Sequence, residues 1–379
     1  MKNKTRLVSI ITFFSVLIIL VACGKKKAEW KGTIEDVDGV TVVKNPIEPM
    51  YGEQIFILEE ELSIGGPEGK DEYVFYRILM DVDESGNMYI LDAAAPNIRV
   101  FDKKGNYIKT IGRKGQGPGE MLSPRSIQLT PQNEIMIYDL RNSRFSFYSL
   151  AGEFLRQNLA ATAAFLFNPK MDSTGYIIGG ILRRESYTLS KFDLELNPVL
   201  TIYAIDLVRL PRTGEQELMV PSFSFDVTKK DNIVCGYNDK YEIQIFDSQG
   251  KLLRKIIKDY KPKEISEKDK EEHIDWLTGG RGYPPDVKVK FPKYHHPFIN
   301  ISADEEDRIF VRTPEKVKGK DIFYYYDVFD SEGKCLAKVP IELKDDRYPL
   351  LFKNKKLFII DEIEEGYQVV KRYKITWKY

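Results

Sequence analysis

The chain has 379 residues, of which 42% are hydrophobic and 12% aromatic, and its 57 basic and 57 acidic residues give a formal net charge of zero. This apolar content is typical of a well-packed globular body and excludes an intrinsically disordered chain. The balanced charge argues against a nucleic-acid binder, which would show a concentrated basic excess.

The N-terminus has the features of a secretory signal over residues 1–22. Three basic residues precede an apolar run at 7–22 that is too short for a comfortable membrane span. The run ends in the sequence LVAC at 20–23, which resembles the bacterial lipobox. The resemblance implies cleavage before Cys23 and a diacylglycerol group on its thiol. The alternative is an uncleaved N-terminal helix.

Residues 23–50 are expected to form a lipidated tether that holds the body off a membrane. The segment contains Lys25, Lys26 and Lys27 and few clustered apolar residues. Gly24 follows the cysteine in place of Asp, and in enteric-type bacteria the resemblance then implies sorting to the outer membrane. Without the signal, 54 basic residues face 57 acidic ones, a net charge of about −3.

Two further cysteines, Cys235 and Cys335, remain in the body of a chain that is expected to leave the cytoplasm. They fall in different repeat units, so we expect no disulfide between them. Packing must then stabilise the body.

A repeated unit follows the tether. Residues 83–112 are echoed by residues 130–155, with Gly105 superposing on Gly152 at an offset of 47 residues. This period predicts a propeller blade or a comparable repeat. Six tight turns, each between an apolar strand and a second β-rich strand, predict six blades. The turns lie at 83–87, 130–134, 171–175, 228–232, 303–308 and 352–356.

The ends of the repeat region are expected to meet. Five units have a hairpin between an aromatic third strand and a fourth strand, whereas the last unit stops after its third strand at 368–376. Residues 55–65 resemble the fourth strand at 107–112. We therefore expect the N-terminal strand to complete the C-terminal blade and close the ring, which removes exposed sheet edges.

A family resemblance rests on residues 111–124 and 138–152, which resemble the NHL repeat. The body at 51–379 resembles the six-bladed propeller lipoproteins common in Bacteroidetes-like bacteria, most sharply in its first two blades. The resemblance implies an all-β fold, a six-bladed β-propeller of four-stranded antiparallel blades. Fold alone does not imply an activity.

The longest connections should share one face of this propeller, the face that carries the loops between blades and the loops between second and third strands. Long loops on a rigid scaffold are where function concentrates. These loops lie at 113–125, 158–169, 206–222 and 259–297.

The insertion at 259–297 is expected to contain a short helix. Ser266 and Asp269 form a capping-box-like start, the helix should reach Leu277, and a glycine-rich turn follows at 279–285. The insertion can be a flap over the channel mouth or a solvated segment packed on the rim.

Basic side chains gather on the same face and are candidates for binding carboxylate, sulfate or phosphate groups. Arg99 and Arg144 are different, because they recur at one repeat position and are expected to pair with neighbouring carboxylates. The candidates are Arg113, Lys114, Arg125, Arg141, Arg183, Arg184, Arg209, Arg212 and Arg281.

Tyr294, His295 and His296 precede the innermost strand of the fifth blade. Paired histidines could ligate a metal or move protons. Adjacent residues on an extended segment point opposite ways, so a packed or hydrogen-bonded pair is the simpler interpretation. Three carboxylates at the ends of second strands could bind Ca²⁺, although a blade-to-blade hydrogen bond is again simpler. They are Asp92, Asp139 and Asp361.

Two functions compete. The first is a monomeric, membrane-anchored binding or scaffold module without a cofactor, which recognises a glycan, peptide or protein. The second is a hydrolase or lyase holding a divalent cation such as Ca²⁺ or Zn²⁺, because the resemblance extends to metal-dependent amidating lyases and lactonases. The lyase pattern needs several histidines from different blades, whereas the mature chain has only His273, His295 and His296. We therefore favour the binding module.

Overall fold

The computed structural model describes residues 28–53, 55–67, 70–159, 165–183, 185–207, 215–284, 287–320, 322–344, 348–363 and 366–378. The predicted signal and Cys23 lie outside the described residues. The helical elements in the described part are the 3₁₀ turn η1 (Asp71–Tyr73) and the helix α1 (Glu267–Thr278). Within these residues, no helix has the length and apolarity that a bilayer span requires.

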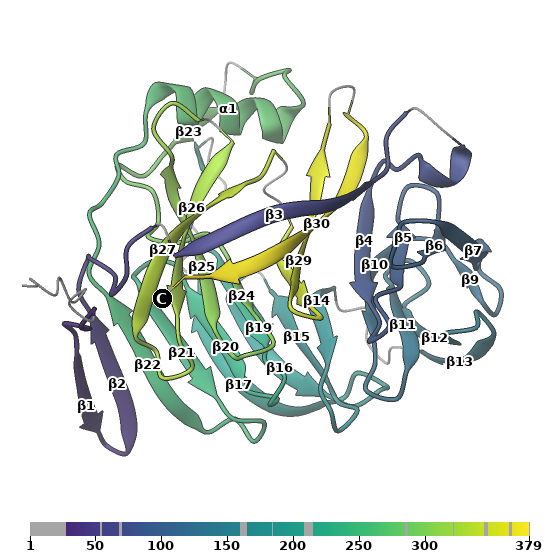
Figure 1. Ribbon diagram of the computed structural model, residues 1–379, viewed down its shortest axis with the longest axis horizontal. Helices are drawn as coiled ribbons and strands as arrows, with labels where there is room; N and C mark the ends of the chain where they lie inside the picture. The colour runs from purple at the N-terminus through teal and green to yellow at the C-terminus, as the bar shows by residue number, and fades with distance from the viewer. Residues whose placement is uncertain are drawn as a thin grey trace, which may run out of the picture.

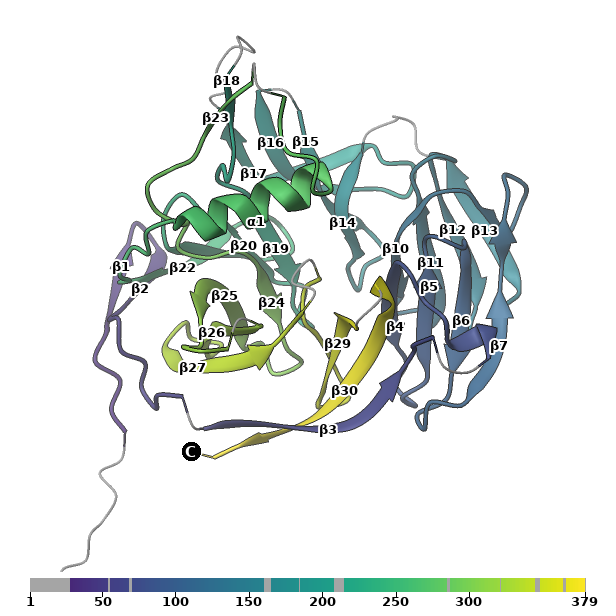
Figure 2. The same ribbon diagram turned by 90° about the horizontal axis from the view of Figure 1, so that it is seen from above.

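Six sheets are arranged around one axis, as Figure 2 shows from above, and the chain passes through them in order. We number them as blades 1 to 6. Each strand pairs antiparallel with the next because short turns join them. Blade 1 holds β4 (Ile78–Val82), β5 (Met88–Asp92), β6 (Asn97–Phe101) and β7 (Tyr107–Ile111); blade 2 holds β10 (Pro124–Leu129), β11 (Glu134–Asp139), β12 (Arg144–Ser149) and β13 (Phe154–Leu159); blade 3 holds β14 (Leu166–Met171), β15 (Ile177–Leu182), β16 (Ser186–Phe192) and β17 (Pro198–Asp206).

The second half of the ring follows the same plan. Blade 4 holds β19 (Phe223–Val227), β20 (Ile233–Tyr237), β21 (Glu242–Phe246) and β22 (Leu252–Lys258); blade 5 holds β24 (Ile301–Ala303), β25 (Ile309–Lys316), β26 (Phe323–Phe329) and β27 (Cys335–Glu342); blade 6 holds β28 (Leu351–Lys353), β29 (Lys356–Glu362) and β30 (Gln368–Trp377). The six predicted turns join the first and second strands of the six blades.

The ring closes as predicted. The N-terminal strand β3 (Phe56–Ile64) pairs antiparallel with β30 and supplies the fourth strand of blade 6. Its register runs from Phe56 opposite Trp377 to Ile64 opposite Val370. Figure 1 shows β3 and β30 side by side although they lie at opposite ends of the chain. The closure pairs the edge strand that the last unit would otherwise expose.

The segment predicted as a tether is partly folded, which corrects that prediction. β1 (Thr33–Val37) and β2 (Val40–Asn45) form a hairpin, and β2 pairs in parallel with β22, so that blade 4 has six strands. Asn45 fixes the junction, because its amide nitrogen donates to Gly333 O at 2.9 Å and its amide oxygen accepts from Cys335 N at 2.7 Å. Blades 4 and 5 are therefore bridged by the N-terminal segment.

The core lies between blades and not at the axis. Along β5, Met88 and Ile90 pack in the cluster shared with blade 6, whereas Tyr89 and Leu91 pack in the cluster shared with blade 2. Successive strand residues point to opposite faces, and here both faces are buried. Each of the six junctions has one such cluster. Burial of one Met, Ile or Leu side chain in such a cluster contributes about 1.5–3 kcal/mol to the free energy of unfolding. Cys235 and Cys335 are free and buried in these clusters.

The repeated hairpin has a physical explanation. In blade 1, Asp102 Oδ1 accepts from the backbone nitrogens of Lys104 and Asn106, and Gly105 between them has φ +86°. Gly152 is the equivalent in blade 2, with φ +97°, and a Cβ there would lie 2.9 Å from Ile111 Cγ1 in blade 1. The glycine therefore serves both the turn and the contact between blades.

Candidate functional site

The long connections share one face, as predicted, which we call the loop face. Because strands alternate in direction, the first-to-second and third-to-fourth turns lie at one end of each blade and the other connections at the opposite end. The insertion places α1 on the loop face in both views (Figures 1 and 2). Ser266 Oγ accepts from Asp269 N at 3.1 Å and Ser266 N donates to Asp269 Oδ2 at 2.9 Å, so the predicted capping box is present.

Carboxylates at the ends of second strands hold the loops of this face. Asp139 Oδ2 accepts from Leu122 N at 2.7 Å, and its Oδ1 accepts from Ser123 N at 2.8 Å. Asp361 Oδ1 accepts from Lys344 N at 2.9 Å. Asp92 likewise accepts from the backbone of its own loop and from Arg99. These side chains therefore organise loops, and their oxygens are already engaged.

Arg99 and Arg144 both support loops but through different partners. Arg99 forms the expected ion pair, with Nη2 3.2 Å from Asp92 Oδ2. The same expectation is wrong for Arg144, whose guanidinium donates to the carbonyls of Gln116, Gly117 and Glu120 at 2.8–3.0 Å. The glycine-rich loop presents bare carbonyl oxygens, and the five donors of a guanidinium match several of them at once.

The remaining candidate arginines divide into three groups. Arg113 is engaged, because its Nε lies 2.8 Å from Glu120 Oε1, and Arg281 donates to Thr278 O at 3.1 Å. Arg125, Arg141 and Arg183 are exposed, and none has a side-chain partner among the described residues. Lys114 is also exposed. Arg184, Arg209 and Arg212 lie outside the described residues.

Exposed aromatic side chains also lie at the loop-face ends of blades 1 and 3. Phe165 and Phe167, at the start of β14, are each 38% exposed and meet edge-on with ring centroids 4.4 Å apart. Tyr76, just before β4, is 56% exposed, and its ring centroid lies 5.3 Å from that of Tyr367. Both pairs lie where strands start on the loop face. They could not be predicted from the sequence, because nothing in the repeat distinguishes an exposed aromatic ring from a core one.

His295 and His296 contact different partners. His295 Nε2 lies 3.2 Å from Asp269 Oδ2, and His296 Nε2 lies 2.7 Å from Met219 O. Burial lowers the pKa of His295, although Asp269 opposes the shift. Tyr294 is 39% exposed, and its backbone forms an isolated bridge with Glu264. The pair therefore anchors the insertion at two points.

No group of three or more His, Cys, Asp or Glu side chains could hold a metal ion within the described part of the chain. The carboxylates that close second strands are used by backbone N–H groups, and the two adjacent histidines are used by separate acceptors. Among the described residues, the candidate carboxylates and the two adjacent histidines are therefore engaged separately.

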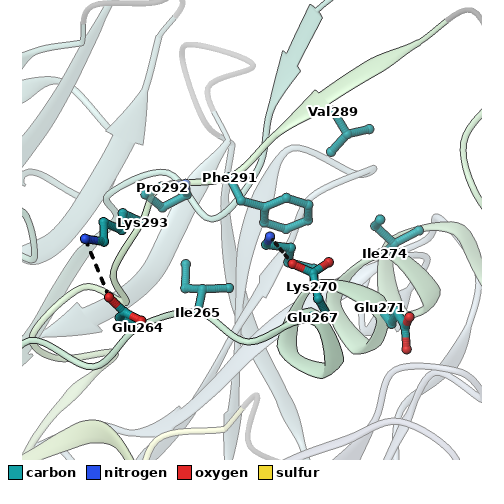
Figure 3. A pocket seen from close by; sticks show the side chains of 10 residues that line it. All are labelled: Glu264, Ile265, Glu267, Lys270, Glu271, Ile274, Val289, Phe291, Pro292 and Lys293. Atoms are coloured by element: carbon teal, nitrogen blue, oxygen red, sulfur yellow. Dashed lines mark hydrogen bonds and ion pairs between the residues drawn. The ribbon is translucent and has the colours of Figure 1, made fainter.

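A groove opens between α1 and the chain that follows the short strand β23 (Lys288–Lys290), with a volume of about 590 Å³. β23 pairs in parallel with β18 (Glu215–Glu217), so the two longest interruptions of the repeat form one structure. Figure 3 shows the two walls of the groove. It is lined by Glu264, Ile265, Glu267, Lys270, Glu271, Ile274, Val289, Phe291, Pro292 and Lys293.

A second set of polar residues, not foreseen, joins the innermost strands near the short turns. Asp81 in β4 accepts from Leu129 N in β10 at 2.7 Å, and Gln128 in β10 accepts from Met171 N in β14 at 2.6 Å. Lys170 in β14 pairs with Asp226 in β19. Burial raises the pKa of Asp81. These side chains occupy one repeat position, two residues before the turn, and they connect neighbouring blades.

Comparisons with known proteins agree on the fold. Residues 69–197 match a family model described as a 6-bladed beta-propeller. A solved structure of a Bacteroides fragilis protein described as exported has a TM-score of 0.55 and 13% identity, with 89% of this chain and 100% of that chain covered. A member of the DUF4221 family from Bacteroides vulgatus has a TM-score of 0.51 and 16% identity, with 86% and 100% covered. No curated protein matches.

Both solved structures are similar at identities that show a common fold and nothing further. The family model covers the first two blades and most of the third, where the repeat is sharpest. Six sheets in chain order around one axis, a last blade completed by the N-terminal strand, and a matching family model lead to one conclusion: the chain is a six-bladed β-propeller.

Proposed function

We propose that this propeller is an envelope-anchored binding module that recognises an anionic glycan, peptide or protein on the part of the loop face formed by blades 1 to 3. The observation that carries the proposal is the contrast among arginines. Arg99 and Arg144 are engaged in loop contacts, whereas Arg125, Arg141 and Arg183 are exposed without a described partner, on a face that also carries exposed aromatic rings. Guanidinium groups bind carboxylate, sulfate and phosphate bidentately, and aromatic rings add apolar contact.

Substitution of all three arginines tests the proposal. An array of acidic glycans and acidic peptides is probed with the wild-type chain and with an Arg125→Ala, Arg141→Ala, Arg183→Ala variant. We expect the variant to lose most binding to the probes that the wild-type chain retains. The matched control removes three exposed lysines from the short-turn face, where binding should not change. These are Lys103→Ala, Lys229→Ala and Lys251→Ala.

The anchor is part of the same proposal. Trp30 Nε1 donates to Asn45 Oδ1 at 2.9 Å, so Trp30 is held against the folded body. If Cys23 carries the lipid, residues 24–29 can span at most about 20 Å, and the rim of blades 4 and 5 stays close to the membrane. Labelling of cells with an alkyne analogue of palmitate should mark the wild-type chain but not a Cys23→Ala variant.

The competing function, a metal-dependent hydrolase or lyase, has its own measurement. Elemental analysis of the purified, untagged chain should find no stoichiometric Ca²⁺ or Zn²⁺. A stoichiometric ion whose removal abolishes a hydrolytic activity would replace the binding module by an enzyme.

A further inference from the structure

Blades 2 and 4 carry a serine at the same repeat position of their innermost strands, four residues before the turn that follows. In blade 4 this residue is Ser224, whose Oγ accepts from Ile301 N of blade 5 at 2.9 Å. In blade 2 it is Ser126, which lies on the same side of β10 as Gln128, because residues two apart on a strand share a side. Gln128 bonds to the backbone of Met171 in blade 3. Ser126 therefore faces the innermost strand of blade 3, as Ser224 faces that of blade 5.

The hydroxyl of Ser126 lacks the partner that its equivalent has. The residue of blade 3 that corresponds to Ile301 is Pro169, three residues before its turn, and proline has no backbone N–H. Ser126 is 9% exposed, and its Oγ is buried without a hydrogen-bond partner among the described residues. Burying an unpaired hydroxyl costs free energy, which a ligand that pairs with it would recover.

The strand that Ser126 faces is irregular at the same point. The pairing of β14 with β15 shifts between Phe167 and Lys170, so Asn168 and Pro169 form a bulge. Asn168 has φ +46°, and its exposed side chain has no partner in the part of the chain that the structure describes. A bulged residue is unpaired in its ladder, so Asn168 can shift without breaking a strand pair.

Arg125 adds a positive charge next to the hydroxyl. It directly precedes Ser126 and lies at a bulge of its own strand, where the pairing of β10 with β11 shifts between Pro124 and Ser126. The guanidinium is exposed and has no side-chain partner among the described residues. The hydroxyl, the guanidinium and the amide of Asn168 can all donate hydrogen bonds, which favours an anionic group as their acceptor.

The charges on the adjoining parts of blades 2 and 3 do not cancel Arg125. Lys170, further along β14, is paired with Asp226. Asp139 accepts from backbone N–H groups. Glu185 is exposed in the loop after β15, and the same loop carries Arg183. One guanidinium is therefore left to balance one negative charge, which suits a carboxylate better than a doubly charged phosphate.

We propose that the junction of blades 2 and 3, at the loop-face ends of β10 and β14, binds the carboxylate group of the anionic ligand. A shift of Asn168 gives the carboxylate access to the hydroxyl of Ser126, while Arg125 donates from its guanidinium. The exposed ring of Phe167, which directly precedes Asn168, contacts the apolar part of the ligand. The inference rests on the proposed function, because Arg125 belongs to both, and it narrows the ligand to a carboxylate borne on an apolar body.

Fluorine NMR titration of the purified chain with para-fluorophenylacetate tests the proposal. We expect binding, and about tenfold weaker binding of para-fluorophenylacetamide, which keeps the ring and lacks the charge. Ser126→Ala should weaken binding of the acid about tenfold. The same variant should melt at or above the wild-type temperature, because no hydrogen bond within the chain is lost. Ser224→Ala is the matched control: it removes an engaged hydroxyl, so it should melt at a lower temperature and bind the acid with wild-type affinity.

Several results would overturn the proposal. No binding of the acid, equal binding of the amide, tighter binding of para-fluorophenyl phosphate, or wild-type affinity in Ser126→Ala would each do so. Ser126→Ala leaves all three arginines in place, so the two proposals can be separated. Wild-type affinity in Ser126→Ala, with binding lost in the triple arginine variant, would refute the carboxylate site alone. Acidic probes that the triple arginine variant still retains would refute the proposed anionic face itself.

Discussion

Hairpin glycines combine two constraints that single substitutions can separate. Gly152 has φ +97°, and an added Cβ would lie 2.9 Å from Ile111 Cγ1, whereas Gly175 has φ +87° with nothing within 4 Å. Gly175→Ala should lower the free energy of unfolding by about 1–2 kcal/mol, the cost of a left-handed conformation. Gly152→Ala adds overpacking and should lower the free energy of unfolding by about a further 1–3 kcal/mol. Urea denaturation of both variants measures the difference.

The comparison isolates the contact between blades. If the two variants lose the same stability, Ile111 relaxes freely and the hairpin glycine serves the turn alone. If Gly152→Ala loses more, a double variant with Ile111→Ala should lose less than the sum of the single changes, because the two sites are in contact.

At the scale of elements, the N-terminal hairpin depends on one buried amide. Asn45 is 3% exposed, and its amide oxygen accepts from Cys335 N and from Trp30 Nε1. Asn45→Ala leaves these donors unpaired and should cost about 1–3 kcal/mol. Limited proteolysis should then cut residues 46–53 faster than in the wild-type chain. Asn106→Ala, which removes a side-chain bond on an exposed turn, should leave that cleavage rate unchanged.

The attachment of α1 should weaken in acid. Burial lowers the pKa of His295 and of His273 below the ordinary value of 6.5. At His295, Asp269 opposes this shift, whereas Lys263 and His296 reinforce it. Folding therefore favours the neutral rings. Their contribution is complete above about pH 6.5 and is lost as the pH falls through the folded-state pKa values.

Hydrogen exchange measures this effect. After correction for intrinsic rates, amides of α1 should lose protection between pH 7.5 and pH 5.5 while those of β11 do not. His295→Gln should reduce the change in α1. Protection of α1 that is the same at both pH values would show that the histidines do not hold the insertion.

The sequence predicted the strands and turns of the repeat well. It predicted poorly those pairings that depend on a contact between distant segments outside the repeat pattern. The six turns and the capping box at Ser266 follow from local patterns, and the closure by β3 follows from the repeat, because the last unit lacks a fourth strand. The pairing of β2 with β22 joins segments about 210 residues apart, and nothing local in residues 40–45 specifies it. For the same reason the ion pair between Lys170 and Asp226, from different blades, was not foreseen.

The face that carries the long connections was predicted, whereas the contacts of the residues on it were not. Topology alone fixed the loop face, because strand direction determines where each connection lies. The engagement of Arg144 was predicted but its partners were not, because the carbonyls that accept from it are brought together only by the folded loop. The groove under α1 needed the contact of two insertions, at 215–217 and 288–290.

At the scale of the whole molecule, closure of the ring should depend on the pairing of β3 with β30 and not on the covalent connection between β3 and blade 1. The register places Phe56 opposite Trp377, so the start of β3 lies beside the end of β30. A truncated chain that begins at residue 66 lacks β3 and leaves the edge of β30 open, so we expect aggregation and no cooperative unfolding. A chain that begins at residue 53 keeps β3 and should unfold cooperatively.

A circular permutant tests whether the pairing of β3 with β30 is enough to close the ring. It begins at residue 66, runs to residue 378, and continues through a linker of about four residues, a common hairpin length, into residues 55–65. The four strands of blade 6 then follow one another as they do in the other blades. We expect the permutant to be soluble and to melt within a few degrees of the chain that begins at residue 53, since both lack the N-terminal hairpin and both contain β3. An aggregating permutant would show that the connection from β3 into blade 1, and not the pairing of β3 with β30, holds the ring together.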